Sequence, residues 1–358
     1  QGVSCDLFDG FWYATGINIG PVHENSLTCD EDAKFTSHLF ALRHLKSLSF
    51  FNCFVLRGKP VSILQTQEWE LLTESLESLE FRSNPGLAGE IPASFGGLKR
   101  LKSLVLIENG LTGTVPENIG NLTGLKRLNL AGNSFTGSGI PASFGGLKQL
   151  LILDISRNSL SGELPPSLGG LISLLKLDLS NNQLTGSIPE ELGSLKQLTL
   201  LDLSNNRLSG ALSKSIQGLS SLQELILSNN PSGGEITALQ WRNLMNLTVL
   251  GLSNMSLTGS IPDAIAELEA LRFLGLNDNK LTGTVPQKLE SLPNITAIHI
   301  QGNNLTGELK FPELFYARLG RRFKAWGNLN LCFTSDAKQP TTSNAPIGVK
   351  QCTQNIIK

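Results

Sequence analysis

The sequence has few cysteines and histidines and no excess of charge of either sign. Only five cysteines and four histidines occur among 358 residues, and 29 basic residues nearly balance 30 acidic ones. A net charge of −1 argues against a general electrostatic partner such as nucleic acid or an anionic membrane. No apolar run reaches the roughly 18 residues of a membrane span. No metal-ligand spacing or phosphate-binding loop is visible, so we expect no cofactor, no metal site and no catalysis.

What the sequence has in abundance is a repeat. Residues 174–197 read LLKLDLSNNQLTGSIPEELGSLKQ, and the pattern starts again at Leu198, 24 residues on. Leu174, Leu177 and Leu179 predict a short strand with its apolar side chains facing inward. The Leu-Thr-Gly-Ser-Ile-Pro segment that follows is the form typical of plant extracellular leucine-rich repeats.

An asparagine marks the ninth position of each repeat, Leu-x-x-Leu-x-Leu-x-x-Asn. A buried turn must satisfy its N–H and C=O groups, and a carboxamide can both donate and accept. Met255 occupies this position once and cannot do so, which predicts a looser or hydrated turn. The structural asparagine ladder comprises Asn84, Asn109, Asn133, Asn158, Asn182, Asn206, Asn230, Asn279 and Asn303.

These features predict the fold class, an α/β leucine-rich-repeat solenoid. We expect a right-handed superhelix of about ten repeats of 24–25 residues, with a parallel β-sheet on the concave face and short or 3-10 helices on the convex face. The predicted parts are an N-terminal cap with an atypical first repeat (1–75), the repeats (76–311) and a C-terminal cap (312–358). Toward the N-terminus, 11–19 is expected to be a strand and 66–78 a helix capped by Thr66.

The cysteines lie only at the two ends of the chain. We pair Cys29 with Cys53 and Cys332 with Cys352, which leaves Cys5 over. A disulfide at each end indicates an oxidising compartment, and the alternative is that all five are buried thiols of an intracellular protein. Five potential N-glycosylation sites favour the secretory pathway: Asn121, Asn246, Asn254, Asn294 and Asn304.

Beyond the general repeat residues, several segments resemble plant leucine-rich-repeat receptor-like proteins. They are most similar to the group of Piriformospora-indica-insensitive protein 2, and more distantly to Too-many-mouths. The resemblance rests on Leu45–Cys53, Leu79–Leu87, Leu271–Asn279, Gly302–Leu309, Phe315, Tyr316, Arg322–Ala325 and Asn330–Cys332. It implies a cell-surface protein without a kinase domain that acts with receptor kinases, in growth, development or the response to root microbes. It also implies that Cys5 is unpaired or pairs with an upstream cysteine of an N-terminal cap.

The solvent-facing positions of the strands are the candidate binding surface. The third, fifth, seventh and eighth positions of each repeat are expected to face outward. The candidate partner-binding residues are Arg127, Asp154, Arg157, Lys176, Asp178, Leu200, Asp202, Ile226, Val249, Phe273 and His299.

Two regions of that surface differ in character. Around repeats three to six, basic residues alternate with Asp154, Asp178 and Asp202, and ordinary cross-strand charge pairing explains them well. Around repeats six to nine, Leu200, Ile226, Val249 and Phe273 are apolar beside the bare backbone expected at Gly251 and Gly275. Exposed apolar patches mark interaction surfaces, although lateral packing or a different strand register would also account for this stripe.

Two functions remain open. In the first, the chain is an extracellular ectodomain that binds a secreted peptide or a receptor-kinase ectodomain at the plasma membrane. In the second, it is a secreted inhibitor of microbial cell-wall hydrolases, similar to polygalacturonase-inhibiting proteins. The segment between Cys29 and Leu76 and the basic cluster Arg318, Arg321, Arg322 and Lys324 resemble the receptor-like group. The simplest interpretation of the basic cluster is a polar end to the solenoid.

Overall fold

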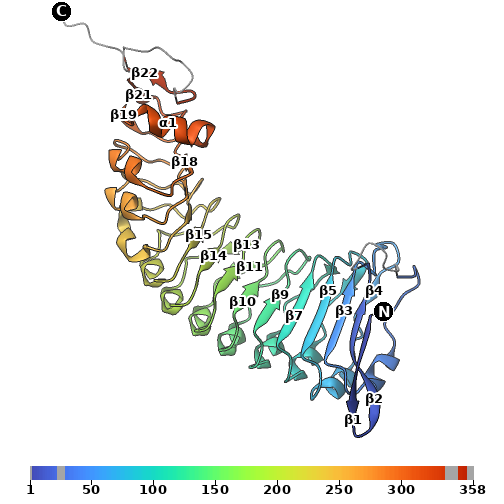
Figure 1. The fold of residues 1–358 in the computed structure, drawn as a ribbon. Coiled ribbons are helices and arrows are strands. Elements are labelled where there is room, and N and C mark those ends of the chain that lie inside the picture. The colour runs from blue at the N-terminus through green and yellow to red at the C-terminus, as the bar shows by residue number, and fades with distance from the viewer. Residues whose placement is uncertain (1, 22–28, 335–345, 353–358) are drawn as a thin grey trace, which may run out of the picture. The chain divides into compact units, whose positions relative to one another are not determined.

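The computed structural model describes residues 2–21, 29–334 and 346–352, and part of the expected C-terminal cap lies outside them. The chain divides into two compact units, Gln1–Thr185 and Gly186–Lys358. In each unit, consecutive repeats place one strand after another in a parallel sheet (Figure 1). This is the leucine-rich-repeat architecture that the sequence predicts.

The main sheet of the first unit opens with an antiparallel hairpin and continues in parallel. The strand expected at 11–19 is β2, and it pairs on one side with β1 and on the other with β3. The order follows the chain: β1 (Val3–Phe8), β2 (Phe11–Ile19), β3 (Ser47–Phe51), β5 (Ser78–Arg82), β7 (Ser103–Ile107), β9 (Arg127–Asn129), β10 (Ile152–Asp154) and β12 (Lys176–Asp178).

Short second strands and 3-10 helices complete the repeats of this unit. The second strands pair as β4 (Val61–Ser62), β6 (Leu87–Gly89) and β8 (Gly110–Leu111), and as β11 (Ser161–Glu163) with β13 (Gln183–Thr185). The 3-10 helices, of which η3 to η6 pack one against the next, are η1 (Ser37–Ala41), η2 (Gln67–Leu72), η3 (Ala93–Gly97), η4 (Glu117–Asn121), η5 (Ala142–Gly146) and η6 (Pro166–Gly170).

The second unit repeats this arrangement. Its main sheet runs β14 (Leu200–Asp202), β15 (Glu224–Ile226), β16 (Val249–Gly251), β17 (Phe273–Gly275), β18 (Ala297–His299) and β20 (Phe323–Lys324). A second sheet joins β19 (Thr306–Leu309), β21 (Asn330–Phe333) and β22 (Lys350–Gln351). The helices are η7 (Glu190–Ser194), η8 (Lys214–Gly218), η9 (Ile236–Ala238), η10 (Trp241–Leu244), η11 (Asp263–Glu267), η12 (Gln287–Ser291), α1 (Glu313–Leu319) and η13 (Gly320–Arg322).

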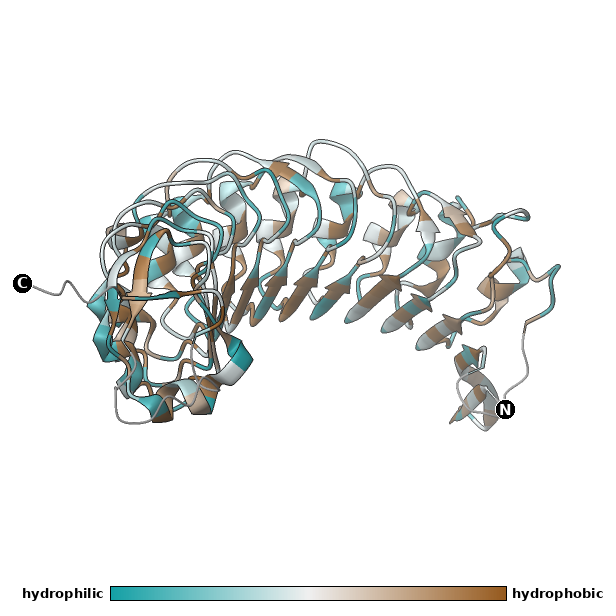
Figure 2. Ribbon diagram, turned by 90° about the horizontal axis from the view of Figure 1, so that it is seen from above, coloured by the Kyte–Doolittle hydropathy of each residue, from teal (hydrophilic) through white to brown (hydrophobic). Residues whose placement is uncertain are grey.

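The core of each unit is a stack of leucines. The first-, fourth- and sixth-position side chains of the repeat are fully buried, as at Leu174, Leu177 and Leu179. The strands are accordingly brown along much of their length in Figure 2. Because a strand alternates its side chains, the third and fifth positions face away from this core.

The predicted asparagine ladder is confirmed. The Oδ1 atom of Asn158 accepts a hydrogen bond from the amide of Phe135 in the preceding repeat at 3.0 Å, and its Nδ2 atom donates to the carbonyl of Leu130 at 3.0 Å. Asn182 and Asn230 make the equivalent bonds. Each amide therefore satisfies the turn of its own repeat and that of the repeat before it.

The ladder departs from the expectation at two places. Met255 is 1% exposed and packed rather than loose. Its amide and that of Leu257 donate to Asn279 Oδ1 at 2.9 and 3.0 Å, and its carbonyl accepts from Gly233 N of the preceding repeat at 2.7 Å. Ser256 beside it takes a φ of +60°, a second left-handed residue next to Asn254. Asn328, in the expected cap, is a further member of the ladder that was not predicted: it accepts from Leu305 N and donates to Ile300 O of the preceding repeat. Its 25-residue distance from Asn303 was the available signal.

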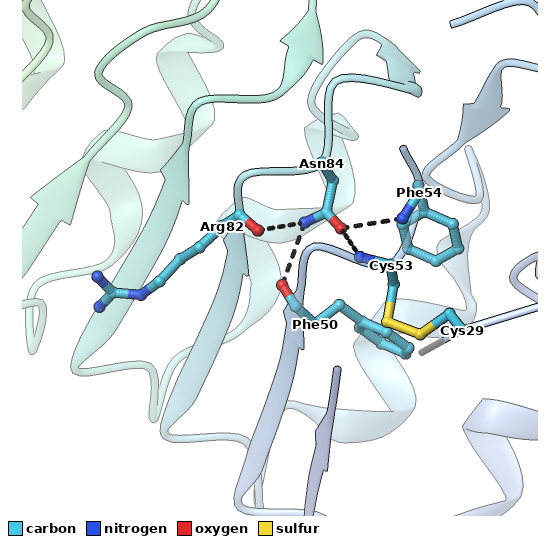
Figure 3. Close-up of a disulfide and its surroundings, with 6 residues drawn as sticks. All are labelled: Cys29, Phe50, Cys53, Phe54, Arg82 and Asn84. Carbon is cyan, nitrogen blue, oxygen red and sulfur yellow. Dashed lines mark hydrogen bonds between the residues drawn. A yellow bond between two sulfur atoms is a disulfide. The ribbon is translucent and has the colours of Figure 1, made fainter. Parts of the chain in front are cut away.

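The first turn uses a cysteine where later repeats use asparagine. Cys53 stands opposite Asn84, whose Oδ1 accepts from the amides of Cys53 and Phe54 at 2.8 and 3.1 Å (Figure 3). Cys53 is bonded to Cys29, and Cys332 to Cys352, so both predicted disulfides are confirmed. Cys5 is exposed and has no disulfide partner among the described residues.

The helix predicted for 66–78 is shorter and tighter than expected. Thr66 does cap it, since its Oγ1 accepts from Glu68 N, but only Gln67–Leu72 is helical, in 3-10 form. Trp69, Leu72 and Leu76 are all fully buried. The prediction of a long helix was wrong because Leu76 is the first position of the next repeat, and its spacing from Leu72 imitates a helical period.

We expect Asn158→Ala to lower the free energy of unfolding by about 2 kcal/mol, because it leaves buried turn groups of two repeats without partners. The neighbouring Ser159→Ala, whose side chain is half-buried, is the control and should change stability little. Urea unfolding followed by circular dichroism measures both. Equal midpoints for the two variants would contradict the role given to the ladder.

Candidate functional site

The outward positions of the strands form a surface that we call the sheet face, made of third- and fifth-position residues. Ile152 and Asp154 on β10, and Glu224 and Ile226 on β15, are half-buried on either side of a buried leucine. Val105 and Asn129, fifth-position neighbours on β7 and β9, are exceptions, since they are 0% and 7% exposed. The third- and fifth-position residues therefore face away from the core, as the sequence predicts, with few exceptions.

The second unit carries the apolar patch, defined as Leu200, Ile226, Val249 and Phe273, on four consecutive strands. Strand register sets Val249 beside Phe273 and Ile226 beside Gly251. Leu200 is separated from Val249 by Glu224 on β15. All four side chains are half-buried, so they present apolar surface without standing fully in solvent.

The two glycines next to the patch are not bare, contrary to the expectation from sequence. A Cβ atom at Gly275 would lie 2.8 Å from Cε1 of Phe273, so the phenyl ring of the same strand occupies that space. At Gly251 the nearest atoms are Cγ2 of Ile226 at 3.3 Å and Oγ of Ser228 at 3.4 Å. The glycines make room for the neighbouring side chains of the patch rather than for a ligand backbone.

His299 borders the patch on β18. Its ring meets that of Phe273 edge to face, with centroids 5.2 Å apart. Burial lowers the pKa of His299 below its usual 6.5, and the nearby Lys324 on β20 lowers it further. The ring is therefore disposed to stay neutral and to extend the aromatic part of the patch.

A row of side-chain amides, which the sequence analysis did not single out, runs along one edge of the patch. Asn254 Nδ2 donates to Asn229 Oδ1 at 3.0 Å, and Asn229 Nδ2 donates to Asn205 Oδ1 at 2.8 Å. We call these three residues the amide row. All three have a positive φ, a conformation that asparagine tolerates better than most residues. Asparagine at the eighth position of three consecutive repeats was the signal in the sequence.

The aspartates of the sheet face accept hydrogen bonds from their own strand ends, and Asp154 Oδ2 also accepts from Asn129 Nδ2 of β9 at 3.0 Å. Asp154 Oδ1 accepts from both the amide and the hydroxyl of Ser156, and Asp202 accepts in the same way from Ser204. Asp178 accepts from Ser180 N at 3.0 Å. The Asp-x-Ser sequence thus forms a local turn at the strand end. No group of three potential metal ligands occurs in the described part of the chain.

The basic residues of the first unit behave differently from one another. Arg157 forms an ion pair with Glu108 at 3.2 Å and not with an aspartate of the sheet. Gly132 lies between the two residues, has a φ of +69°, and has no side chain to obstruct the pair. Arg127 keeps a buried Nε without a hydrogen-bond partner. Cross-strand Asp–Arg pairing therefore does not explain Arg157. The aspartates are explained instead by the hydrogen bonds that they accept from the serines of their own strand ends.

The five potential glycosylation sites are exposed, but they lie on different parts of the repeats. Asn121 is the last residue of η4, and Asn246 and Asn294 lie in the segments that lead into β16 and β18. Asn304 precedes β19 of the second sheet. Asn254 alone belongs to the amide row beside the patch.

The basic cluster near the C-terminus has a structural use. Arg322 donates to the carbonyls of Leu319 and Arg318, at 3.3 and 3.1 Å, and so caps the last turn of α1. The guanidinium of Arg318 lies over the ring of Phe315, 5.5 Å from its centroid. These contacts favour the interpretation of the cluster as the polar end of the repeats.

The buried leucine stack, the asparagine ladder and the parallel sheet define a leucine-rich-repeat protein. The family of leucine-rich repeat regions matches residues 93–323, and the chain belongs to it. Within that family, the chain is 55% identical over 110 residues to Piriformospora indica-insensitive protein 2 of Arabidopsis thaliana, a match that covers 31% of this chain and 25% of that protein.

Solved structures place the fold among plant receptor ectodomains. A TDR receptor matches with a TM-score of 0.73 at 28% identity, covering 84% of this chain and 50% of that one. The Arabidopsis receptor kinase HAESA, in complex with the peptide hormone IDA and the co-receptor SERK1, matches with a TM-score of 0.71 at 30% identity. The match covers 93% of this chain and 56% of the HAESA chain. No helix in residues 2–21, 29–334 and 346–352 has the length and apolar character to cross a membrane.

We expect His299 to titrate below 6.5, because burial opposes its charged form. The unfolded chain then binds the proton more readily than the folded one. Protonation of His299 therefore lowers the free energy of unfolding, fully so at pH values below the pKa of the folded state. This loss disappears as the pH rises to 6.5, so the free energy of unfolding should increase between those two pH values.

An NMR titration of the imidazole protons measures the pKa directly. Phe273→Ala should move it back toward 6.5 by exposing the ring, whereas Ile152→Ala on β10 of the first unit serves as a control without effect. A midpoint at or above 6.5 in the unmodified protein would show that the ring is not held neutral.

Proposed function

We propose that this chain is a non-catalytic, extracellular binding ectodomain of a receptor-like protein that signals with a receptor kinase. The apolar patch carries the proposal. Its four side chains occupy strand positions that face away from the core, where ordinary repeats place polar residues. Exposed apolar surface of this kind marks interaction sites in soluble proteins.

The patch fits a partner that contributes an apolar anchor and hydrogen-bonding groups. Phe273, Val249 and Ile226 supply the apolar contact, and aromatic anchors contribute most in many interfaces. The amide row offers donors and acceptors along one edge, which suits the backbone of an extended peptide or the loops of a partner ectodomain. Asp202, which stands beside Ile226 in the strand register, would then tune specificity at the periphery of the patch.

Related proteins support this choice of partner. The HAESA structure, whose fold resembles this one, holds a peptide hormone and a co-receptor. Because this chain covers about half of that receptor and a quarter of the curated relative, partners and localisation at the cell surface are proposals for this protein. The absence of catalysis is part of the same proposal, since the sheet-face aspartates are engaged in turns.

Cross-linking mass spectrometry of the protein at the plant cell surface tests the proposal. The unmodified protein should capture a receptor-kinase ectodomain or a secreted peptide, with cross-links near β16 and β17. Phe273→Ser should reduce that capture about tenfold, because loss of an interface anchor costs more than about 1.4 kcal/mol. Thermal unfolding establishes that the variant is folded.

Ile152→Ser is the matched control, because Ile152 is a half-buried third-position residue of the first unit. Its capture should equal that of the unmodified protein. Recovery of a microbial cell-wall hydrolase without a receptor kinase would favour the inhibitor function instead. Unchanged capture with Phe273→Ser would remove the patch from the binding surface.

A further inference from the structure

The position of Asn254 separates it from the other potential glycosylation sites. It follows β16 by three residues, is exposed, and is the terminal member of the amide row. The row crosses the ends of β14, β15 and β16, and the same three strands carry Leu200, Ile226 and Val249. A group attached to Asn254 would therefore stand at the edge of the apolar patch.

The side-chain amide of Asn254 can keep its hydrogen bond to Asn229 after N-glycosylation. N-glycosylation replaces one of the two hydrogens on Nδ2 and leaves the other available as a donor. Asn229 Oδ1, 3.0 Å from Nδ2, can still accept that hydrogen. The hydrogen bond restricts rotation of the amide, and the first sugar is bonded to the same nitrogen. The amide row thus becomes a rigid support for a glycan.

We propose that Asn254 carries an N-linked glycan that shields one edge of the apolar patch. During transfer, Nδ2 attacks C1 of a lipid-linked oligosaccharide pyrophosphate; the Nδ2–C1 bond forms, the C1–oxygen bond breaks, and lipid pyrophosphate leaves. Nδ2 loses one proton. Ser256 supplies the hydroxyl of the Asn-x-Ser acceptor sequence. The two disulfides place the chain in an oxidising compartment, where this transfer takes place.

The glycan limits what can reach the patch. A bulky partner could not approach across the amide row, whereas an extended chain could still enter from the opposite edge, where the strands begin. Phe273 on β17 lies one strand beyond the amide row, and the glycan would leave it open as an anchor. This consequence for partner choice rests on the function proposed above, but the modification and the shielding do not.

Glycopeptide mass spectrometry of the full chain secreted by plant cells measures occupancy at Asn254. Ser256→Gly is the matched variant without the acceptor sequence. It keeps Asn254 and its hydrogen bond, and glycine suits the φ of +60° at this position. Thr123→Ala removes the acceptor sequence of Asn121 instead, and controls for the loss of a glycan elsewhere.

Thiol labelling measures shielding without any ligand. In a Cys5→Ala background, Val249→Cys places a thiol in the patch, and Ser103→Cys places one at the equivalent position of β7 as control. N-ethylmaleimide is the small probe, and a maleimide on a long polyethylene glycol chain is the large one. The large probe should react severalfold faster at Val249→Cys when Ser256→Gly removes the glycan.

The same change should leave N-ethylmaleimide labelling and both rates at Ser103→Cys unaltered, and Thr123→Ala should not affect Val249→Cys. An unmodified Asn254 in the secreted protein would overturn the proposal. So would equal rates for the large probe with and without the glycan. The two proposals can fail separately. If Phe273→Ser leaves partner capture unchanged while the labelling rates still show shielding at Val249→Cys, the proposed function is wrong and the glycan proposal stands.

Discussion

The side-chain amide of the ninth-position asparagine is the interaction on which the remaining structure depends. A turn that follows every short strand would bury unpaired N–H and C=O groups, and one carboxamide satisfies groups of two successive turns. At Asn84, Asn158 and Asn230 this fixes the direction in which the chain leaves the strand. With that direction fixed, the leucines of each repeat turn inward, and the third and fifth positions are left to face solvent.

The fold could be predicted from the sequence because its signals recur in every repeat. Leucine spacing gave the strands, the asparagines gave the turns, and cysteines confined to the two ends gave both disulfides. Errors occurred where one signal had two meanings. Leu76 continued an apparent helical period from Leu72, but it is the first position of the next repeat and precedes the strand Ser78–Arg82. Asn328 was missed because Gly320 stands where the first leucine of its repeat should be.

The candidate site was predictable only in part. The sequence identifies which residues face outward, but not which hydrogen bonds their side chains make or which neighbouring atoms cover them. Asp154 and Asp202 look available in the sequence, yet each accepts two hydrogen bonds from a serine two residues away. Gly275 looks open, yet the ring of Phe273 covers it. The hydrogen bonds of the aspartates and the position of the Phe273 ring depend on side-chain rotamers, which the repeat spacing does not determine. The contrast between polar groups engaged locally and apolar groups left on the surface emerges only in three dimensions.

The ladder also gives the chain a direction of assembly. The Oδ1 atom of Asn182 accepts from the amide of Leu160, 22 residues earlier, so an asparagine completes a turn that was synthesised before it. A nascent chain emerging from the ribosome or the translocon therefore leaves its last turn unsatisfied until the following repeat arrives. Folding then proceeds vectorially, one repeat behind synthesis, as nearest-neighbour coupling in solenoids permits. The turn after Asn230 is completed differently, because Gly233 N donates to the backbone carbonyl of Met255. That turn depends on the following repeat but not on an asparagine side chain.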